Sequence, residues 1–247
     1  YTRVFGGYSL ERFDVTDVDD DAASVIKKFK GENWSSTVDV GATRDTTDNT
    51  FLPTRGTVNS VTVGYSGGPL GGSTDYITYN YASHWFKSLF AGTIFHVKGQ
   101  AGYVAKNFSD AEVPPWVRFY LGGIDTVRGY SGSRISPKDS VSGDRIGGNK
   151  TFFTNLEYFI PVSRELNIWS LAFFDAGNAW DDDQPFFKDT KDREGKSLPL
   201  GLYKSVGIGL RWNSPFGPLR VEYGYPLDKL ANSSDSGRFE FKMGGAF

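Results

Sequence analysis

The sequence contains no cysteine, only two histidines and a single methionine among its 247 residues. Without cysteine the chain has no disulfide framework and no thiolate metal site, and the absence of stray thiols fits a protein of the cell envelope. The two histidines, His84 and His96, lie far from any second metal-ligand pattern. We therefore expect no metal site and no cofactor.

A large excess of charge is also missing, since 27 lysine and arginine residues nearly balance 29 aspartate and glutamate residues for a net charge of −2. Nucleic-acid binding relies on a basic surface, so we expect no nucleic-acid partner. No run of about 18 apolar residues is present, which excludes a transmembrane helix. A lipid bilayer remains a possible partner, because each strand of a transmembrane barrel needs only about 9–11 residues of alternating apolar and polar character.

The sequence also lacks an initiating methionine and a signal peptide, and it begins inside a strand-like segment at Tyr1. We therefore expect the chain to be an excised piece or a processed product of a longer protein. Its length suffices for one large all-β domain or two small ones. We interpret residues 1–247 as a single β-barrel domain.

Aromatic residues, at 16%, and glycine, with 30 residues, are abundant. Apolar and polar residues alternate with period two through most of the chain, whereas helical periodicity is rare. Val206, Ile208 and Leu210, for example, alternate with glycines. Ten such strand-like segments lie near residues 3–11, 34–43, 60–65, 77–85, 95–103, 151–161, 168–180, 205–212, 219–225 and 238–247. One helical turn is expected around residues 22–29.

The connections between these segments alternate in length. Long loops are expected at residues 16–33, 66–74, 107–149, 181–200 and 228–237, and short turns at residues 51–56, 86–92, 162–166 and 214–218. Outer-membrane barrels combine longer extracellular loops with short periplasmic turns. The pattern predicts an all-β fold, an antiparallel transmembrane β-barrel with about ten strands in this chain.

A soluble β-sandwich is the competing interpretation, because its strands also alternate and its apolar faces meet between two sheets. Two features favour the barrel. Aromatic residues recur at the ends of the apolar faces, as in the interfacial girdles of membrane barrels. Closure of a barrel also removes the exposed edges that the terminal strands would otherwise leave.

The longest interruption between strands, residues 107–149, contains an arginine surrounded by aromatic and apolar residues. Arg128 is followed by Gly129 and Tyr130, and Trp116 and Tyr120 precede it. A loop of this length is usually functional or disordered, and its aromatic residues argue against disorder. We expect the loop to fold back into the barrel and to hold Arg128 there.

Five stretches, taken in order, resemble one family. They are FLPTRG at 51–56, VRGY at 127–130 (Val127, Arg128, Gly129, Tyr130), LEYFIP at 156–161, FDAGNAW at 174–180 and WNSPFGPLR at 212–220. Together with the terminal aromatic Phe247, they resemble the BamA-type outer-membrane assembly family, whose superfamily includes TamA and FhaC. The resemblance covers essentially the whole chain.

Several expectations follow from this resemblance. It implies a location in the bacterial outer membrane and a non-enzymatic function, the folding and insertion of other outer-membrane proteins. It also implies unfolded outer-membrane proteins as clients and periplasmic assembly lipoproteins as partners. The alternatives are a translocation pore like TamA or FhaC and, from another class, a passive porin. Family barrels have sixteen strands preceded by POTRA domains. The ten strands expected here are therefore either the C-terminal part of such a barrel or a smaller barrel that closes alone.

The resemblance also assigns partners to the loop arginine. It implies that Arg128 enters the barrel lumen and pairs with Glu157 and Asp175 on two neighbouring strands. Each carboxylate is the acidic member of an otherwise apolar strand, and a partly dehydrated charge favours a partner. The alternative is that each carboxylate is simply solvated in the lumen. Paired carboxylates can also act in acid–base catalysis, but an arginine between them keeps them ionised, so we expect no catalytic residues.

The last strand-like segment suggests a second functional feature. A weakly paired seam of a barrel offers backbone groups to an incoming strand, and Gly244 and Gly245 weaken pairing near the strand end. The simpler interpretation is that Phe239, Phe241, Met243 and Phe247 face lipid, and both can hold. In the family this strand pairs with the first barrel strand, which we expect to be missing from this chain.

Overall fold

The computed structural model of the chain describes residues 1–50, 52–107, 112–230 and 236–244. Ten strands form one antiparallel sheet in the order β1-β2-β3-β4-β5-β6-β7-β10-β11-β12. Their bounds are β1 (Thr2–Val15), β2 (Gly31–Asp45), β3 (Gly56–Ser66), β4 (Tyr76–Ser88), β5 (Ile94–Lys106), β6 (Lys150–Ser163), β7 (Ile168–Trp180), β10 (Tyr203–Ser214), β11 (Gly217–Pro226) and β12 (Arg238–Met243). The expected all-β antiparallel fold is therefore confirmed.

The remaining elements lie in the connections. They are the helical turn α1 (Ser24–Lys27), the 3-10 turns η1 (Gly68–Leu70), η2 (Phe90–Gly92), η3 (Pro115–Val117) and η4 (Pro199–Gly201), and a small hairpin of β8 (Thr190–Lys191) and β9 (Ser197–Leu198). The helical turn expected around residues 22–29 corresponds to α1. No helix in the described ranges is long and apolar enough to cross a membrane.

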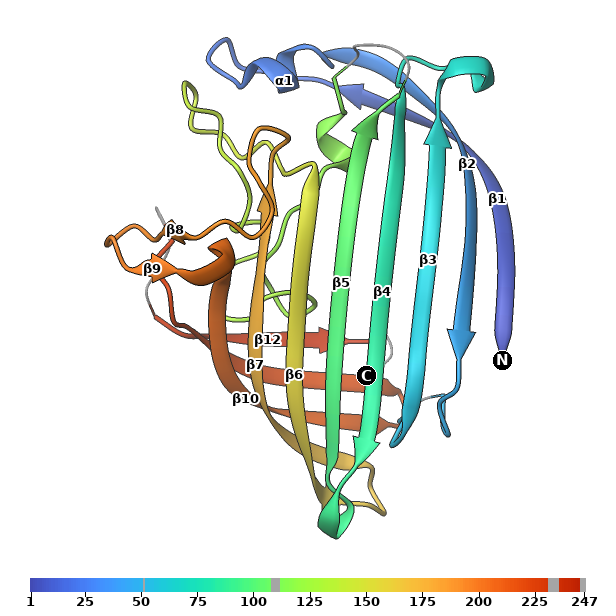
Figure 1. Ribbon diagram of the computed structural model, residues 1–247, viewed down its shortest axis with the longest axis vertical. Helices are drawn as coiled ribbons and strands as arrows, with labels where there is room; N and C mark the ends of the chain where they lie inside the picture. Colours follow the sequence, from blue (N-terminus) through green and yellow to red (C-terminus); the bar gives the residue numbers. More distant parts are fainter. Residues whose placement is uncertain (51, 108–111, 231–235, 245–247) are drawn as a thin grey trace.

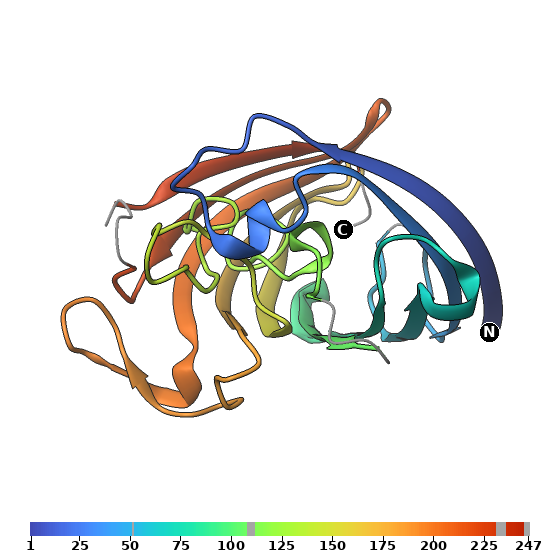
Figure 2. The same ribbon diagram turned by 90° about the horizontal axis from the view of Figure 1, so that it is seen from above.

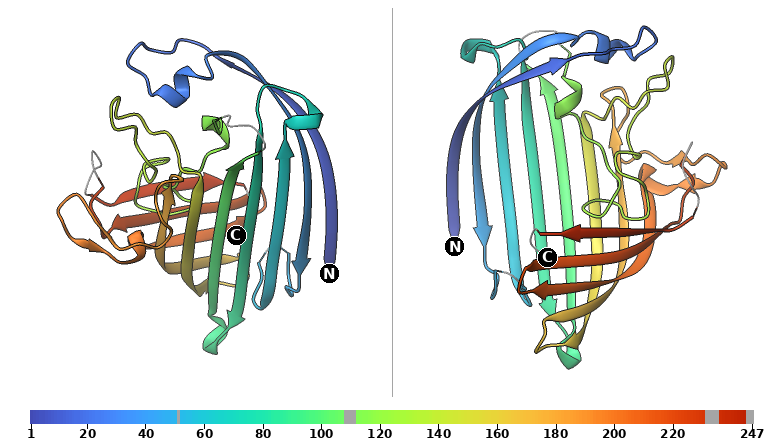
Figure 3. Two further views of the ribbon diagram at one scale, coloured as in Figure 1. Left: turned by 45° about the horizontal axis from the view of Figure 1, so that its top comes forward. Right: turned by 180° about the vertical axis from the view of Figure 1, so that it is seen from behind.

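The sheet is a strongly curved wall (Figures 1 and 3). Strands β1 to β5 run upright in Figure 1, whereas β10 to β12 cross behind them at a steep angle, and Figure 2 shows the wall curving around a hollow. Among the described residues, β1 and β12 each pair with one neighbour only and not with each other. The ten strands thus form an open wall. We call its concave side the lumen.

The convex face of the wall is apolar and exposed. Large exposed side chains from both ends of the sheet lie on it, including Val4, Tyr8, Leu10, Val40, Val61, Tyr81, Ile208, Leu210, Val221, Phe239, Phe241 and Met243. The only other sheet in the part of the chain that the structure describes is the two-stranded β8–β9 hairpin, which is too small to cover this face as the second sheet of a β-sandwich would. An exposed apolar surface of this extent marks contact with lipid or another apolar partner.

The connection between β5 and β6 fills part of the lumen (Figure 2). Its side chains Leu121, Val127, Tyr130 and Ile135 are buried and form one cluster with Phe153 of β6. Apolar burial of this kind is the main force that holds a long segment against a sheet. The loop is therefore part of the packed structure and carries Arg128 down into the lumen.

Candidate functional site

Arg128 is the most buried charged side chain of the loop, with 1% of its surface exposed. Its Nε donates to Asp175 Oδ2 at 2.7 Å, and its Nη2 donates to Asp175 Oδ1 at 2.6 Å. The backbone N–H of Arg128 also donates to Asp175 Oδ2, at 3.0 Å. One carboxylate on β7 therefore holds both the guanidinium and the backbone of the loop, in the bidentate geometry that makes Arg–carboxylate pairs strong.

The remaining guanidinium nitrogen of Arg128 reaches two more strands. Its Nη1 donates to Glu157 Oε1 on β6 and to Glu222 Oε2 on β11, each at 2.7 Å. The guanidinium carbon also lies 3.6 Å from the ring centroid of Phe173, where a cation–π contact is favourable. Three carboxylates from three strands thus surround one arginine.

Two further arginines complete the charge balance. Arg211 of β10 donates from Nε to Glu222 Oε1 at 2.8 Å and from Nη2 to Glu157 Oε1. Arg220 of β11 donates from Nε to Glu222 Oε1 at 3.0 Å. The cluster contains three guanidinium groups and three carboxylates, all mostly buried. Equal opposite charge offsets the cost of removing these ions from water.

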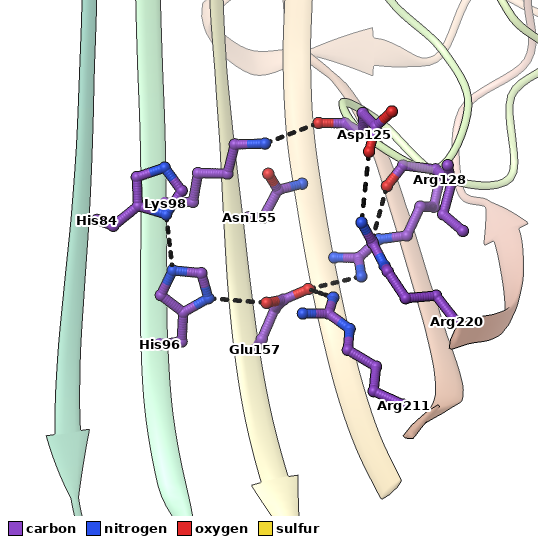
Figure 4. Close-up of a pocket in the computed structure, with 10 residues that line it drawn as sticks. His84, His96, Lys98, Asp125, Arg128, Asn155, Glu157, Arg211 and Arg220 are labelled. Carbon is purple, nitrogen blue, oxygen red and sulfur yellow. Dashed lines mark hydrogen bonds and ion pairs between the residues drawn. The ribbon is translucent and has the colours of Figure 1, made fainter. Parts of the chain in front are cut away.

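Asp125, nearer the loop tip, extends the contacts to both ends of this part of the sheet. Its carboxylate accepts hydrogen bonds from Lys242 of β12 at 2.7 Å and 2.8 Å, and from Arg220 at 3.3 Å. Its backbone carbonyl accepts a bond from Lys98 of β5 at 2.9 Å. Through direct bonds and the shared carboxylates, the loop is connected to every strand of the main sheet from β5 to β12. Figure 4 shows part of this network, with Asp125 and Arg128 of the loop facing Lys98, Glu157, Arg211 and Arg220.

Two glycines allow the loop backbone to approach the wall. Gly129 has φ of +85°, and a Cβ at this position would lie 2.9 Å from the carbonyl carbon of Gly224 on β11. A Cβ on Gly224 would lie 2.5 Å from the backbone nitrogen of Gly129. Glycine is needed on both sides because no other residue fits this spacing, and Gly129 additionally adopts a left-handed conformation.

The tyrosine of the VRGY stretch anchors the loop on its other side. The hydroxyl of Tyr130 lies 2.9 Å from the backbone carbonyls of Lys204 and Asp228, and the ring packs edge-on against Tyr203. Val127, the first residue of the stretch, is fully buried in the same apolar cluster. All four residues of the stretch therefore contact the wall or its connections.

The two histidines lie together at the side of the ion cluster. His96 Nδ1 lies 2.8 Å from Glu157 Oε2, and His84 Nδ1 lies 3.3 Å from His96 Nε2 (Figure 4). His96 also stacks on Phe86 with a centroid distance of 4.2 Å. Since Glu157 Oε2 is an acceptor, the proton of a neutral His96 lies on Nδ1 and its Nε2 accepts from His84. The sequence did not predict the contact of His96 with Glu157.

The arrangement of these ions suits a structural role, holding the loop against the sheet, rather than a catalytic one. The carboxylates of Glu157, Asp175 and Glu222 are occupied by guanidinium groups, which leaves them poorly placed to exchange protons with a substrate. Within the residues that the structure describes, no group of His, Asp and Glu side chains has the arrangement of a metal site. What the geometry does is fix a loop across a curved sheet.

The structure therefore brings together Arg128, Glu157 and Asp175, which the sequence singled out. It adds Glu222, Arg211 and Arg220, which sequence reasoning did not assign to the site. A signal for them was present, because period-two alternation places Arg211 and Glu222 on the polar face of their strands. The pairing register between β10 and β11 was missing from that reasoning.

The residues expected at a seam lie at the edge of the sheet. Phe239, Phe241 and Met243 point to the exposed convex face from β12. Gly244 follows the strand with φ of +86°, and its N–H donates to the carbonyl of Pro218 at 2.8 Å. The other two expected residues, Gly245 and Phe247, lie outside the described residues.

A curved antiparallel wall with an apolar convex face and a lumenal loop fixed by buried ion pairs defines the class of protein, an outer-membrane β-barrel. The chain belongs to the Omp85 superfamily, whose domain model matches residues 2–247. The resemblance to the BamA-type family is thereby confirmed, as is the expected location in the bacterial outer membrane.

Several proteins are similar to this chain over most of its length. It is 42% identical over 248 residues to the outer membrane protein assembly factor BamA of Nitratidesulfovibrio vulgaris, and the match covers 100% of the chain and 30% of that protein. The BamA of Neisseria meningitidis is 29% identical over 238 residues, covering 89% of the chain and 29% of that protein. The chain thus spans less than a third of the length of these relatives. They are assembly factors by name, in agreement with the expectation of a non-enzymatic protein.

Solved structures support the fold. The crystal structure of BamA from Haemophilus ducreyi lacking POTRA domains 1–3 matches with a TM-score of 0.71 at 23% identity, covering 87% of this chain and 43% of that one. CdiB from Acinetobacter baumannii matches with a TM-score of 0.55 at 14% identity, covering 85% of this chain and 33% of that one. The open wall corresponds to part of a larger barrel.

Proposed function

We propose that this chain is the barrel part of an outer-membrane protein assembly factor, which folds and inserts other barrel proteins. Two findings support the proposal. The first is the 42% identity to a BamA over the full chain. The second, on which the mechanism depends, is the set of bonds that joins Arg128 to Glu157, Asp175 and Glu222.

In this mechanism the ion cluster acts as a latch. We define the latch as Arg128 with its three carboxylates. Because these carboxylates lie on β6, β7 and β11, the latch restrains the relative motion of four consecutive strands of the main sheet, β6, β7, β10 and β11. The contacts of Asp125 with Lys98 and Lys242 extend this restraint to β5 and β12. Such rigidity is useful to a protein that inserts others into the membrane. The edge of the sheet can then open while the strands joined by the latch keep their curvature.

The edge strand supplies the surface on which clients are templated. Strand β12 pairs with β11 on one side only among the described residues, so its outer backbone groups can pair with an incoming strand by β-augmentation. The side chains of Phe239 and Phe241 face outward at the same time. A client strand added there would already have its apolar side chains in the lipid layer.

This proposal includes the partners that the family resemblance implies. The clients are unfolded outer-membrane proteins, and the bilayer surrounds the convex face. Periplasmic assembly lipoproteins would bind parts of the longer protein to which this chain is similar. A translocation pore of the same superfamily is the alternative, and it would carry its cargo across the membrane rather than into it.

The test uses the full-length parent protein in proteoliposomes with a urea-unfolded barrel protein as client. We compare the wild type with Arg128→Ala and with the control Arg3→Ala, which removes an exposed arginine of β1. Client that becomes heat-modifiable and protease-resistant measures insertion. We expect client insertion by Arg128→Ala to fall by about tenfold or more, because losing one member of a buried ion cluster costs several kcal/mol. Insertion by Arg3→Ala should stay near the wild-type level.

Three results would contradict the proposal. Equal insertion by the wild type and Arg128→Ala would remove the latch from the mechanism. Client recovered inside the vesicles would favour a translocation pore. Steady single-channel conductance without insertion would favour a passive porin, because a lumen filled by a loop should conduct weakly and erratically.

A further inference from the structure

The connection between β7 and β10 packs on the outside of the wall, in contrast to the lumenal loop (Figure 2). Phe187 lies edge-on to Phe152 of β6, with ring centroids 5.3 Å apart. Phe186 and Phe187 both pack edge-on against Trp180 of β7, at 5.1 Å and 5.7 Å. The even-numbered residues of β6 and β7 face the convex side, so this contact covers the lipid-facing surface near the loop-bearing end of the strands.

The aromatic pair of this connection remains partly exposed. Phe186 and Phe187 stack on each other and keep 41% and 43% of their surface accessible. Phe187 has φ of +56°, a conformation that is unusual for a bulky residue and that calls for a compensating interaction. Aromatic residues at this depth form the interfacial belts of membrane proteins, where the ring lies among the lipid headgroups.

A cavity of about 310 Å³ lies beside the aromatic pair. We call it the rim pocket and define it by six of its lining residues, namely Ser136, Trp180, Gln184, Lys188, Lys191 and Tyr203. It combines two aromatic side chains with several hydrogen-bonding groups. Pockets with an apolar lining and a few convergent polar groups are typical ligand sites.

The rim pocket has an excess of positive charge. The side chains of Lys188 and Lys191 make no hydrogen bond or ion pair with any residue that the structure describes, whereas the backbone of Lys191 pairs with Ser197 in the β8–β9 hairpin. The adjacent acids are already occupied by backbone groups: Asp189 accepts from Leu200 at 2.7 Å, and Asp192 accepts from three amides, including that of Lys196 at 2.8 Å. Two lysines without local partners favour an anionic ligand.

We propose that the rim pocket binds the phosphorylated sugar headgroup of a glycolipid in the outer leaflet. The two lysines neutralise the phosphate, Gln184 and Ser136 provide hydrogen-bonding groups for hydroxyls, and the partly exposed ring of Tyr203 supplies a flat surface. The exposed pair Phe186 and Phe187 contacts the first part of the acyl chains. Basic pockets at the membrane surface recognise lipid headgroups in this way. The proposal requires only the outer-membrane location, not the assembly function.

Native mass spectrometry of the full-length parent protein in detergent tests this binding. The probes are a bisphosphorylated diglucosamine lipid, the same lipid without phosphates, and inorganic phosphate. We compare wild type with the double variant Lys188→Gln, Lys191→Gln and with a matched control, Lys27→Gln, Lys30→Gln, which removes the same charge from the β1–β2 connection. All four lysines are exposed or partly exposed, so the variants should fold.

We expect wild type and control to bind the phosphorylated lipid about tenfold more tightly than its dephosphorylated form, and the rim variant to lose this preference. Equal binding of both lipids by wild type would overturn the proposal, as would a rim variant that binds like the control. Competition by inorganic phosphate at the concentration of the lipid itself would show that the pocket takes a free anion and not a headgroup.

Discussion

The two parts of the sheet differ in what covers their concave side. Strand β1 is exposed along almost its whole length on both faces, β2 mixes exposed, half-buried and buried residues, and β3 is mostly half-buried. In β6, by contrast, residues alternate between buried and half-buried over ten positions, because the loop covers the lumenal face. The two parts have the same antiparallel backbone pairing but differ in burial. Because resistance to local unfolding increases with burial, we expect β6 and its neighbours to open less readily than β1 to β3.

The difference also concerns charge. The lumenal face of β5 to β12 contains a balanced set of buried ions, whereas acids of the N-terminal strands such as Glu11 remain exposed. A buried ion cluster adds little net stability compared with apolar packing, but removing one member is costly because the others stay buried without a partner. Such a cluster favours a single placement of the loop, because any other placement would leave buried charges unpaired.

The largest predicted effect comes from Arg128→Ala, which leaves Glu157, Asp175 and Glu222 short of a cation. Breaking a buried ion pair costs about 3–5 kcal/mol, so we expect urea unfolding in detergent to shift by an amount in this range. Arg3→Ala on the exposed β1 is the control and should change the unfolding free energy by less than about 0.5 kcal/mol. Equal shifts for both variants would abolish the distinction between the two parts.

A smaller effect is predicted for Gly224→Ala. Its Cβ would lie 2.5 Å from the nitrogen of Gly129, so the loop must move away from β11. Overpacking of this kind costs about 1–3 kcal/mol. Limited proteolysis of residues 121–135 should become faster. Gly99→Ala on β5 is a matched control, because its Cβ meets no atom within 4 Å, and loop protection that is the same in both variants would contradict the close approach.

His96→Phe should weaken the cluster moderately. Phenylalanine keeps the stacking on Phe86 but leaves Glu157 Oε2 without its donor, which costs about 1–2 kcal/mol for a buried acceptor. The unfolding free energy in detergent measures the loss. His84→Phe removes only the outer member of the pair and should cost less, so a larger loss for His84→Phe would show that the bond to Glu157 is unimportant.

The smallest effect concerns pH. Burial alone would raise the pKa of Asp125, but the hydrogen bond and charge of Lys242, with Arg220 and Lys98 nearby, hold that pKa below its ordinary value. The ionised carboxylate therefore stabilises the folded form fully above the unfolded pKa of about 3.9, and this contribution is lost as pH falls through the lower folded pKa.

Water screens this contact, since the side chains of Asp125 and Lys242 are 54% and 35% exposed, so we expect less than about 1 kcal/mol. Proteolysis near Asp125 should increase slightly between pH 5 and pH 3, measured with an acid-active protease. Asp125→Asn should abolish the dependence. A pH response that persists in this variant would assign it to another group.

Much of the fold was predictable because period-two alternation and loop lengths are local properties of the sequence. The ten strands and the turn α1 follow from them, but the connection between β2 and β3, residues 46–55, is longer than the short turn expected at residues 51–56. The expected partners of Arg128 depended on resemblance, since nothing local links residue 128 to residues 157 and 175. Glu222 and the rim pocket could not be derived, because they require the curvature that brings β11 and the β7–β10 connection to their neighbours.

Hydrogen exchange at the backbone amide of Arg128 tests the central claim most directly. This amide belongs to a loop, yet it donates to Asp175 at 3.0 Å under a buried cluster. The latch predicts exchange as slow as that of the β7 amides in the wild type, and exchange at least about tenfold faster in Glu222→Gln, which keeps the bond to Asp175 but weakens the cluster. Fast exchange in the wild type, at the rate of the β1–β2 connection, would contradict the account.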